Sequence, residues 1–267
     1  MYAFEYHRPA SIREAAKLAR KLADSRVIAG GQSLIPALKL RLARAAALID
    51  LGDLPELRGI SVVGTSVVIG AATRHAEVAA SKDVRAALPM LASLAAGIGD
   101  RQVRTMGTLG GALANNDPAA DYPAAVLGLN ATITTNKRDI AADKFFTGLF
   151  ETALRPGEII TSVSFPLTKR AAYVKFRHPA SRFALVGVCV AESSGGVRVA
   201  VTGAASCAFR AKKMEKALAA SFTAAALARV RIPADKLNSD IHASAEYRSH
   251  LITVIAQRAV EAALAGK

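Results

Sequence analysis

The chain has 267 residues, a formal net charge of +14 and two cysteines, and these properties exclude several classes of protein. Two cysteines are too few for the four thiolates that an iron–sulfur cluster normally takes, or for a four-cysteine zinc site. No apolar run approaches the roughly 20 residues that span a bilayer, and the N-terminus lacks the order of a secretory signal. We therefore predict a soluble, cytoplasmic chain in which Cys189 and Cys207 stay as thiols, although a disulfide is possible in principle.

The positive charge has three candidate explanations, namely nucleic acid, an acidic partner surface or an anionic ligand. The basic residues are spread along the chain without a block of five or six, there is no Trp, and only 5% of the residues are aromatic. Few aromatic platforms are therefore available for stacking bases. A basic nucleic-acid-binding protein remains a rival hypothesis that rests on the charge alone.

Helices and strands alternate in the first two-thirds of the predicted structure. Ser11 and Glu14 form a capping box at the start of the first helix. Apolar periodicity and glycine or proline punctuation give the other elements. Helices are predicted over 11–23, 33–42, from a cap at Thr73 to 80, over 89–96 and from 121 to 129. Strands are predicted over 27–29, 48–51, 59–63, 67–71, 131–135 and 158–165.

The pattern changes after Pro166, where strands follow one another directly. Strands are predicted over 172–177, 183–191 and 197–202, with a Ser-Gly-Gly hairpin turn at 194–196, and a long helix over 244–264. We place a domain boundary near 167–170. The sequence thus predicts an α+β protein, with one domain over 1–168 and a three-stranded antiparallel sheet followed by helices over 169–267.

Two glycine-containing turns are candidate ligand sites. The first turn, AGGQSLIP, joins a strand to a helix and consists of Ala29, Gly30, Gly31, Gln32, Ser33, Leu34, Ile35 and Pro36. Glycine lets a ligand approach bare backbone, and free N–H groups at a helix start attract an anion. It matches neither a Walker loop nor the Rossmann fingerprint. A tight strand-to-helix turn with an ordinary serine cap is the alternative.

The second turn begins at Thr108 in the segment TLGGALANNDPAADYPA and offers a hydroxyl followed by an expected exposed stretch of backbone at Gly110-Gly111. Asp121 is placed to accept hydrogen bonds from sugar or ribityl hydroxyls. A plain loop with Asp121 as a helix cap is the alternative. Two anion-binding turns suit the extended shape of a dinucleotide, provided that they converge in space.

Five segments in order along the chain resemble the FAD-binding medium subunits of molybdenum hydroxylases, a family that includes carbon monoxide dehydrogenase, nicotine and isoquinoline oxidoreductases and the flavin domain of xanthine dehydrogenase. They are AGGQSLIPALKLRLARAAALIDL (29–51), ELRGI (56–60), RQVRTMGTLGGALANNDPAADYPAA (101–125), RPGEIIT (155–161) and YVKFRHPASRFALVGV (173–188). The resemblance covers essentially the whole chain.

This resemblance implies a two-subdomain FAD-binding fold of the vanillyl-alcohol oxidase and MurB type, followed by a small C-terminal flavoprotein domain. The FAD pyrophosphate is expected on the first turn and on Thr108, Leu109, Gly110, Gly111 and Ala112. Asp121, Ile160 and Lys175 are expected to contact the cofactor, and Ile98 to lie beside the flavin ring. Ile98 and Ile160 as plain core residues, and Lys175 as a solvated strand lysine, remain alternatives.

Two positions depart from the family pattern. Ala112 stands where the family usually has Ser or Asn, so one phosphate contact would come from backbone or water only. Phe183 stands where an aromatic Tyr is expected near the flavin face, so a hydroxyl is missing there. The five histidines show no ligand spacing, and core or surface positions are expected for them.

The resemblance also implies partners, because FAD would carry the redox chemistry while the protein positions it. No catalytic acid, base, nucleophile or metal ligand is expected in this chain. A large molybdenum-cofactor subunit would oxidise the substrate, a small subunit with two [2Fe–2S] clusters would deliver electrons to FAD, and an external acceptor would receive them. A dimer of heterotrimers is the expected assembly, and association with the inner face of the membrane through the complex is an alternative to a free cytoplasmic location. A stand-alone FAD oxidoreductase and a flavin-free structural adaptor remain alternatives.

Overall fold

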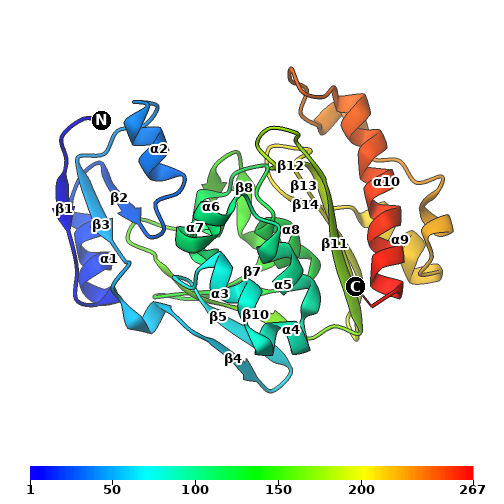
Figure 1. The fold of residues 1–267 in the computed structure, drawn as a ribbon, viewed down its shortest axis with the longest axis horizontal. Coiled ribbons are helices and arrows are strands. Elements are labelled where there is room, and N and C mark those ends of the chain that lie inside the picture. Colours follow the sequence, from blue (N-terminus) through cyan, green and yellow to red (C-terminus); the bar gives the residue numbers. More distant parts are fainter. Residues whose placement is uncertain (267) are drawn as a thin grey trace.

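A computed structural model describes residues 1–266 and arranges them as four sheets with helices between and beside them (Figure 1). The N-terminal lobe, blue in Figure 1, is a three-stranded parallel sheet in the order β1-β3-β2. Its elements are β1 (Glu5–His7), α1 (Ile12–Lys21), β2 (Ser25–Ile28), α2 (Leu34–Lys39), β3 (Ala47–Asp50) and the 3₁₀ turn η1 (Pro55–Leu57). The predicted capping residue of α1 is confirmed, because the Ser11 hydroxyl accepts a hydrogen bond from the Glu14 N–H at 3.2 Å.

The middle of the chain forms a five-stranded antiparallel sheet in the order β4-β5-β10-β6-β7. Its strands are β4 (Ile60–Val63), β5 (Ser66–Gly70), β6 (Thr132–Thr135), β7 (Asp139–Ala141) and β10 (Ile160–Pro166). The helices of this part are α3 (His75–Ala80), α4 (Lys82–Ala87), α5 (Pro89–Ala96), α6 (Arg101–Met106), α7 (Leu109–Asn115) and α8 (Tyr122–Gly128). The turn η2 (Ala142–Lys144) and the small hairpin of β8 (Phe146–Gly148) and β9 (Glu151–Thr152) complete this part.

Two local predictions in this region were wrong. Thr73 does not cap α3, because the helix begins after Arg74 and the Thr73 hydroxyl instead bonds both the N–H and the C=O of Gly59, at 3.2 and 3.1 Å. The stretch 97–111, to which no element was assigned, contains α6 and the start of α7. Its glycines lie between and at the ends of these short helices, which hid the helical periodicity.

The C-terminal part is an antiparallel sheet of β11 (Arg170–Arg177), β12 (Ala184–Ser193) and β13 (Gly196–Thr202), with the C-terminal helices on one face and α8 on the other. These are the three predicted strands, and a fourth short strand, β14 (Phe209–Arg210), was missed. The remaining elements are α9 (Lys212–Ala220), the turns η3 (Ala224–Leu227) and η4 (Ala234–Lys236), and the predicted long helix, α10 (Ala245–Leu264). No helix among residues 1–266 has the length and apolarity that a bilayer crossing requires.

Strand β12 connects the middle and C-terminal parts because both of its faces are buried. Val186, Val188 and Val190 point into the core under α10, whereas Cys189 and Ala191 point into the core under α8. This two-residue alternation is that of a strand between two layers. Helix α8 lies so close to the strand that a Cβ on its Gly128 would be 2.5 Å from the Cys189 Sγ. The two cores therefore share one strand.

A second contact between these parts is ionic. Asp143, from η2, accepts hydrogen bonds from Arg198 of β13 at 2.9 and 3.0 Å and from Arg210 of β14 at 2.9 Å. Arg198 also donates to the Leu127 carbonyl of α8 at 2.9 Å. Both arginines thus fix the C-terminal sheet against α8 and η2, and they hold the pKa of the Asp143 carboxyl below its usual value although burial opposes this.

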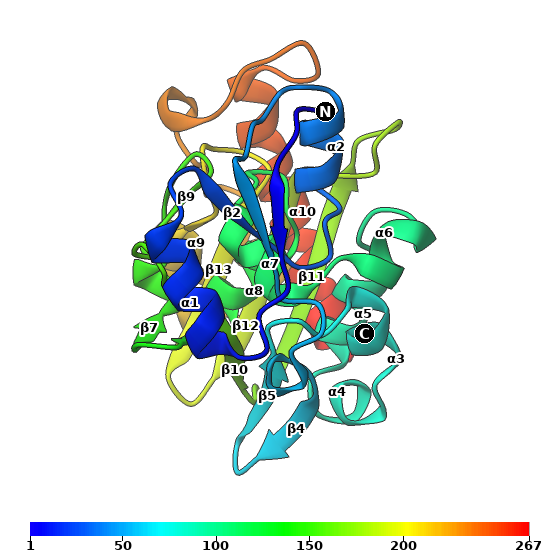
Figure 2. The same ribbon diagram turned by 90° about the vertical axis from the view of Figure 1, so that its left-hand side faces the viewer.

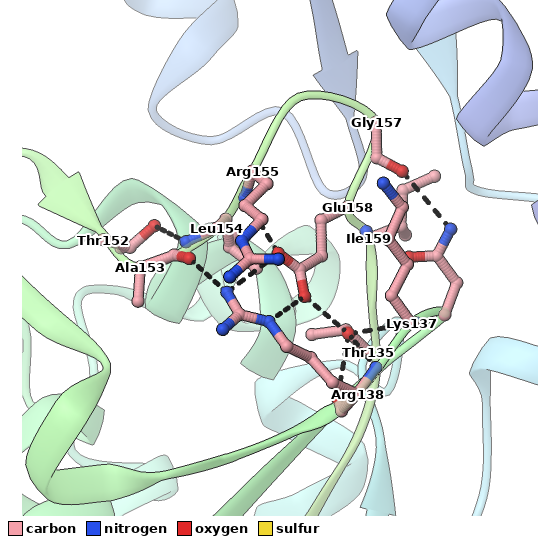
Figure 3. A network of polar contacts seen from close by, with 11 residues as sticks. Thr135, Lys137, Arg138, Thr152, Ala153, Leu154, Arg155, Gly157, Glu158 and Ile159 are labelled. Carbon is pink, nitrogen blue, oxygen red and sulfur yellow. Dashed lines mark hydrogen bonds and ion pairs between the residues drawn. The ribbon is translucent and has the colours of Figure 1, made fainter.

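Glu158 organises the connection that leads into β10 (Figure 3). Its buried carboxylate accepts hydrogen bonds from the Arg138 guanidinium at 2.9 and 3.2 Å, the Thr135 hydroxyl at 2.9 Å and the Arg155 N–H at 2.9 Å. Four hydrogen bonds to one carboxylate favour its charged form. The bond from Arg138 is the largest cause, and the pKa of Glu158 falls to about 2. This network fixes the start of β10, where Ile160 lies.

We expect Glu158→Gln to lower the free energy of unfolding by roughly 2–3 kcal/mol at neutral pH, because Arg138 loses its charged partner. The folded-state pKa lies below the ordinary value of 4.5. The contribution of Glu158 is therefore complete above about pH 4.5 and is lost as the pH falls towards 2. Chemical denaturation at pH 7 and pH 3 measures both effects. The exposed Glu261→Gln is the control, and an equal stability of the two variants at pH 7 would contradict this role.

Candidate functional site

The two glycine turns meet in space. A Cβ on Gly30 would lie 2.7 Å from the Cα of Gly107, and closer still to the Met106 carbonyl oxygen. A Cβ on Gly111 would lie 4.0 Å from the Cβ of Ala29. Figure 2 looks onto the N-terminal lobe, with α7 lying behind its sheet. The convergence that a dinucleotide site requires is therefore present between the N-terminal lobe and the start of α7.

The first turn offers a row of unpaired donors. Within residues 1–266, the backbone N–H groups of 30–34 have no hydrogen-bond partner, and the first paired N–H is that of Ile35, which donates to the Gly31 carbonyl at 2.9 Å. Gly31 has a φ of +69°, in the left-handed region, which turns successive N–H groups to one side. Ser33 occupies the N-cap position without a side-chain capping bond. The alternative of an ordinary serine cap was wrong.

The second turn offers less free backbone than the sequence suggested. The N–H of Leu109 donates to the Thr73 carbonyl at 3.1 Å, and the N–H of Gly110 donates to the Ala71 carbonyl at 2.8 Å. Both residues are buried, so the prediction of an exposed Gly110-Gly111 stretch was wrong for Gly110. Gly111 is exposed, and its N–H donates to the Thr108 hydroxyl oxygen at 3.2 Å. The free donors therefore lie mainly on the first turn.

Asp121 and Lys175 form a buried ion pair. The Lys175 Nζ donates to the Asp121 Oδ2 at 2.8 Å, and the two side chains are 5% and 3% exposed. The Tyr173 hydroxyl donates to the other carboxylate oxygen, and Lys175 also donates to the Gly97 carbonyl at 3.0 Å. Burial raises the pKa of the Asp121 carboxyl, and Lys175 and Tyr173 oppose that rise. Asp121 makes no helix-capping bond, and Lys175 is not a solvated lysine, so both alternatives were wrong.

The remaining sequence-predicted residues lie around this pair or in the adjoining core. Ile98 follows Gly97, whose carbonyl accepts from Lys175, and is 9% exposed. Ile160 is 5% exposed in the same hydrophobic core. Ala112 is half-buried on α7, and Phe183 is 45% exposed in the turn between β11 and β12. Contact of these residues with a cofactor stays a prediction.

Sequence reasoning missed two buried aromatic residues that link the turns to the ion pair. The N–H of His75 donates to the Gly107 carbonyl at 2.9 Å, and its ring lies 5.3 Å from that of Tyr122, the neighbour of Asp121. The His75 Nδ1 and the Tyr122 hydroxyl have no hydrogen-bond partner in the described part of the chain. Burial lowers the pKa of His75 to about 4, so the ring is neutral at pH 7. His75 lies outside the quoted motifs, and Tyr122 lies within the second one, where nothing local indicates contact with His75.

Metal ligands do not gather near these residues. Over the 266 described positions, no group of three or more His, Cys, Asp or Glu side chains has an arrangement that could hold a metal ion. The chemistry available to the site is therefore that of fixed donors and charges. The unpaired N–H row fits a diphosphate, because helix starts and left-handed turns bind such anions through backbone donors.

We expect Lys175→Met to lower the free energy of unfolding by about 3 kcal/mol, because it leaves a carboxylate buried without its counter-ion. The double variant Asp121→Asn/Lys175→Met removes both charges and is expected to recover most of that loss. Denaturant titration of the wild type, both single variants and the double variant measures the coupling. Additive losses in the double variant would show that the two side chains do not form a pair.

Comparisons with known proteins show which family the chain resembles. Residues 2–168 match the family described as the FAD binding domain in molybdopterin dehydrogenase. The carbon monoxide dehydrogenase medium chain of Hydrogenophaga pseudoflava is 36% identical, over 98% of this chain and 97% of that one. The nicotine 6-hydroxylase medium subunit of Paenarthrobacter nicotinovorans is 36% identical, over 97% and 96%.

A solved structure shows the same similarity in three dimensions. The reconstituted CO dehydrogenase from Oligotropha carboxidovorans has a chain that superposes with a TM-score of 0.91 at 35% identity, covering 100% of this chain and 99% of its own. The family match, the sequence identity over nearly the full length and the shared fold all point to one family. The protein belongs to the FAD-binding medium subunits of the molybdenum hydroxylases, the oxidoreductase family that its five sequence segments resemble.

Proposed function

We propose that this chain holds FAD between its two glycine turns, receives electrons from iron–sulfur clusters of a partner subunit and passes them to an external acceptor. The observation that carries the proposal is the close approach of Gly30 to Gly107 beside a row of unpaired N–H groups. A diphosphate needs several donors on one side and room for its oxygens, and glycines leave that room.

The binding residues divide into two groups. The first turn, Ala29–Pro36, would bind the pyrophosphate through backbone N–H groups, and the second turn, Thr108–Ala112, would close the other side with the Thr108 hydroxyl and the exposed Gly111. At position 112 the alanine brings no polar atom, so backbone donors carry that part of the contact. The free donors come from the first turn, because the Gly111 N–H already donates to the Thr108 hydroxyl oxygen.

Asp121, Lys175 and Ile98 would orient the cofactor's reactive ring. FAD supplies the redox chemistry when bound, and the protein supplies position and electrostatics. The buried Lys175 ammonium is held by Asp121 and the Gly97 carbonyl, so its place is fixed before any ligand arrives. A cation held at a fixed position costs no reorganisation when negative charge develops beside it. Ile98 and Ile160 would provide apolar contact that excludes water.

The electron path needs other chains, because this one has two cysteines and no described metal-ligand group. The relatives are named medium chains or subunits, which indicates larger and smaller partners. We infer a large molybdenum-cofactor subunit and a small subunit with two [2Fe–2S] clusters, in a dimer of heterotrimers. The domain limits at 1–168 and 169–267 belong to this proposal, supported by the extent of the family match.

The test is cofactor content. We expect the purified protein to be yellow and to release stoichiometric FAD on denaturation, and we expect Gly31→Val to retain less than about a tenth of it. Gly31 has a positive φ, and a Cβ there would lie 3.1 Å from the Ile35 side chain, so a β-branched residue distorts the turn. Absorbance at flavin wavelengths and chromatography of the released nucleotide measure the outcome.

Gly195→Ala is the matched control, because its Cβ would meet only the Ser193 hydroxyl at 3.7 Å, far along the chain from both turns. It should retain FAD fully. Circular dichroism and thermal unfolding show whether Gly31→Val remains folded. Normal flavin content in folded Gly31→Val would remove the first turn from the site, and a wild-type protein without FAD would refute the function.

A further inference from the structure

We propose that the C-terminal end of α2 is a docking surface for an acidic protein subunit. The docking surface consists of Tyr2, Leu40, Arg41, Leu42 and Arg44. The inference rests on the proposed function, because that function requires another chain to bring electrons to FAD. It adds where on this chain that partner binds and by what chemistry.

The docking surface combines exposed apolar area with restrained positive charge. Leu40 is 70% exposed and Leu42 is 79% exposed, although solvation of two neighbouring leucines is unfavourable. The guanidinium carbons of Arg41 and Arg44 lie 5.3 and 5.6 Å from the centre of the Tyr2 ring. These cation–π contacts hold both cations beside the leucines before a partner arrives. Tyr and Arg are the residue types that protein interfaces favour.

The backbone at Arg41 is strained, and this strained turn leaves the side chain of Leu42 exposed to solvent. Leu42 N–H donates to the Ala37 carbonyl at 2.9 Å and Arg41 N–H to the Leu38 carbonyl at 3.2 Å, which is a Schellman ending of α2. Arg41 has a φ of +60° at the position where glycine is usual. In this motif the residue after it normally packs back on the helix, yet here Leu42 remains exposed. The fold thus tolerates strain without burying the leucine.

The same combination recurs at two other turns. Leaving aside Asp and Asn, which accept the left-handed conformation more easily, the non-glycine residues with positive φ in the described chain are Arg41, Phe150 and Arg182. Phe150, in the β8–β9 turn, is 56% exposed, and Arg182 precedes the 45% exposed Phe183. Each strained residue therefore lies at or beside a large exposed apolar side chain. Strain kept at such positions indicates a functional surface.

The charge identifies the occupant. Residues 25–49 contain Arg26, Lys39, Arg41 and Arg44 and no Asp or Glu, within a chain of net charge +14. An acidic surface is therefore the complementary partner. A lipid surface fits less well, because interfacial membrane binding uses a long amphipathic helix whereas α2 has six residues. The cations here are mainly arginines held on a ring, which suits bidentate pairing with carboxylates.

The test is assembly of the complex in the native host. Tagged wild-type chain, Leu40→Ser/Leu42→Ser and Arg41→Gly are purified over a range of salt concentrations, and FAD, iron and molybdenum are measured. We expect Leu40→Ser/Leu42→Ser to keep its FAD, but the iron and molybdenum that co-purify with it should fall at least tenfold relative to wild type. We expect Arg41→Gly to be as stable as wild type or more so, because strain is relieved. Its complex should nevertheless dissociate at lower salt.

Val62→Ser/Val63→Ser is the matched control. These valines are 47% and 61% exposed on the β4–β5 hairpin, at the lower end of the molecule in Figure 1, away from α2. This variant should assemble like wild type. Wild-type iron and molybdenum in folded Leu40→Ser/Leu42→Ser would overturn the docking surface. A second outcome would also overturn it. In that outcome the wild type binds phosphatidylglycerol vesicles, and Leu40→Ser/Leu42→Ser loses the vesicle binding but keeps its complex intact. FAD-containing wild type without iron or molybdenum would instead refute the partner-dependent function itself.

Discussion

The close backbone approach at Gly30 is the constraint on which the site depends. Because the first turn lies directly against Met106 and Gly107, any side chain at position 30 would push the N-terminal lobe away from α7. The contact therefore fixes the distance between the turn that follows β2 and the connection between α6 and α7, although Gly30 and Gly107 are 77 residues apart in sequence (107 − 30). Beside this contact, the N–H groups of 30–34 have no hydrogen-bond partner within residues 1–266. A ligand bound there completes hydrogen bonds that the fold alone leaves open.

The rest of the structure supports this contact by linking it to the C-terminal sheet. His75 bonds the Gly107 backbone and packs on Tyr122, the first residue of α8, and Asp121 beside it pairs with Lys175 of β11. Strand β12 is shared by two cores. Burying an ion pair is costly unless its groups are well bonded. Here the pair also accepts from Tyr173 and donates to Gly97, so the charges stay fixed.

The positive charge of the chain is not used uniformly. At the candidate site the donors are mostly neutral backbone N–H groups, and Lys175 is already paired with Asp121. Other cations, such as Arg138, Arg198 and Arg210, form internal networks that hold strands and layers together. The cations near the end of α2 are different, because they lie beside exposed leucines and no acidic residue of 25–49 neutralises them. The internal arginines therefore stabilise the fold, whereas the exposed arginines near α2 are placed to attract a partner of opposite charge.

The sequence by itself determined the α+β class, most helices and strands within a few residues, and the family, because periodicity, capping and five ordered segments are local signals. It also identified both glycine turns. Only the tertiary structure decided that the turns meet, that Gly110 is buried with its N–H bonded to Ala71, and that Asp121 pairs with Lys175 instead of capping α8. It alone revealed His75 and Tyr122 between them. These features join residues from separate elements, and local sequence patterns carry no information about which distant groups a buried donor or charge will find.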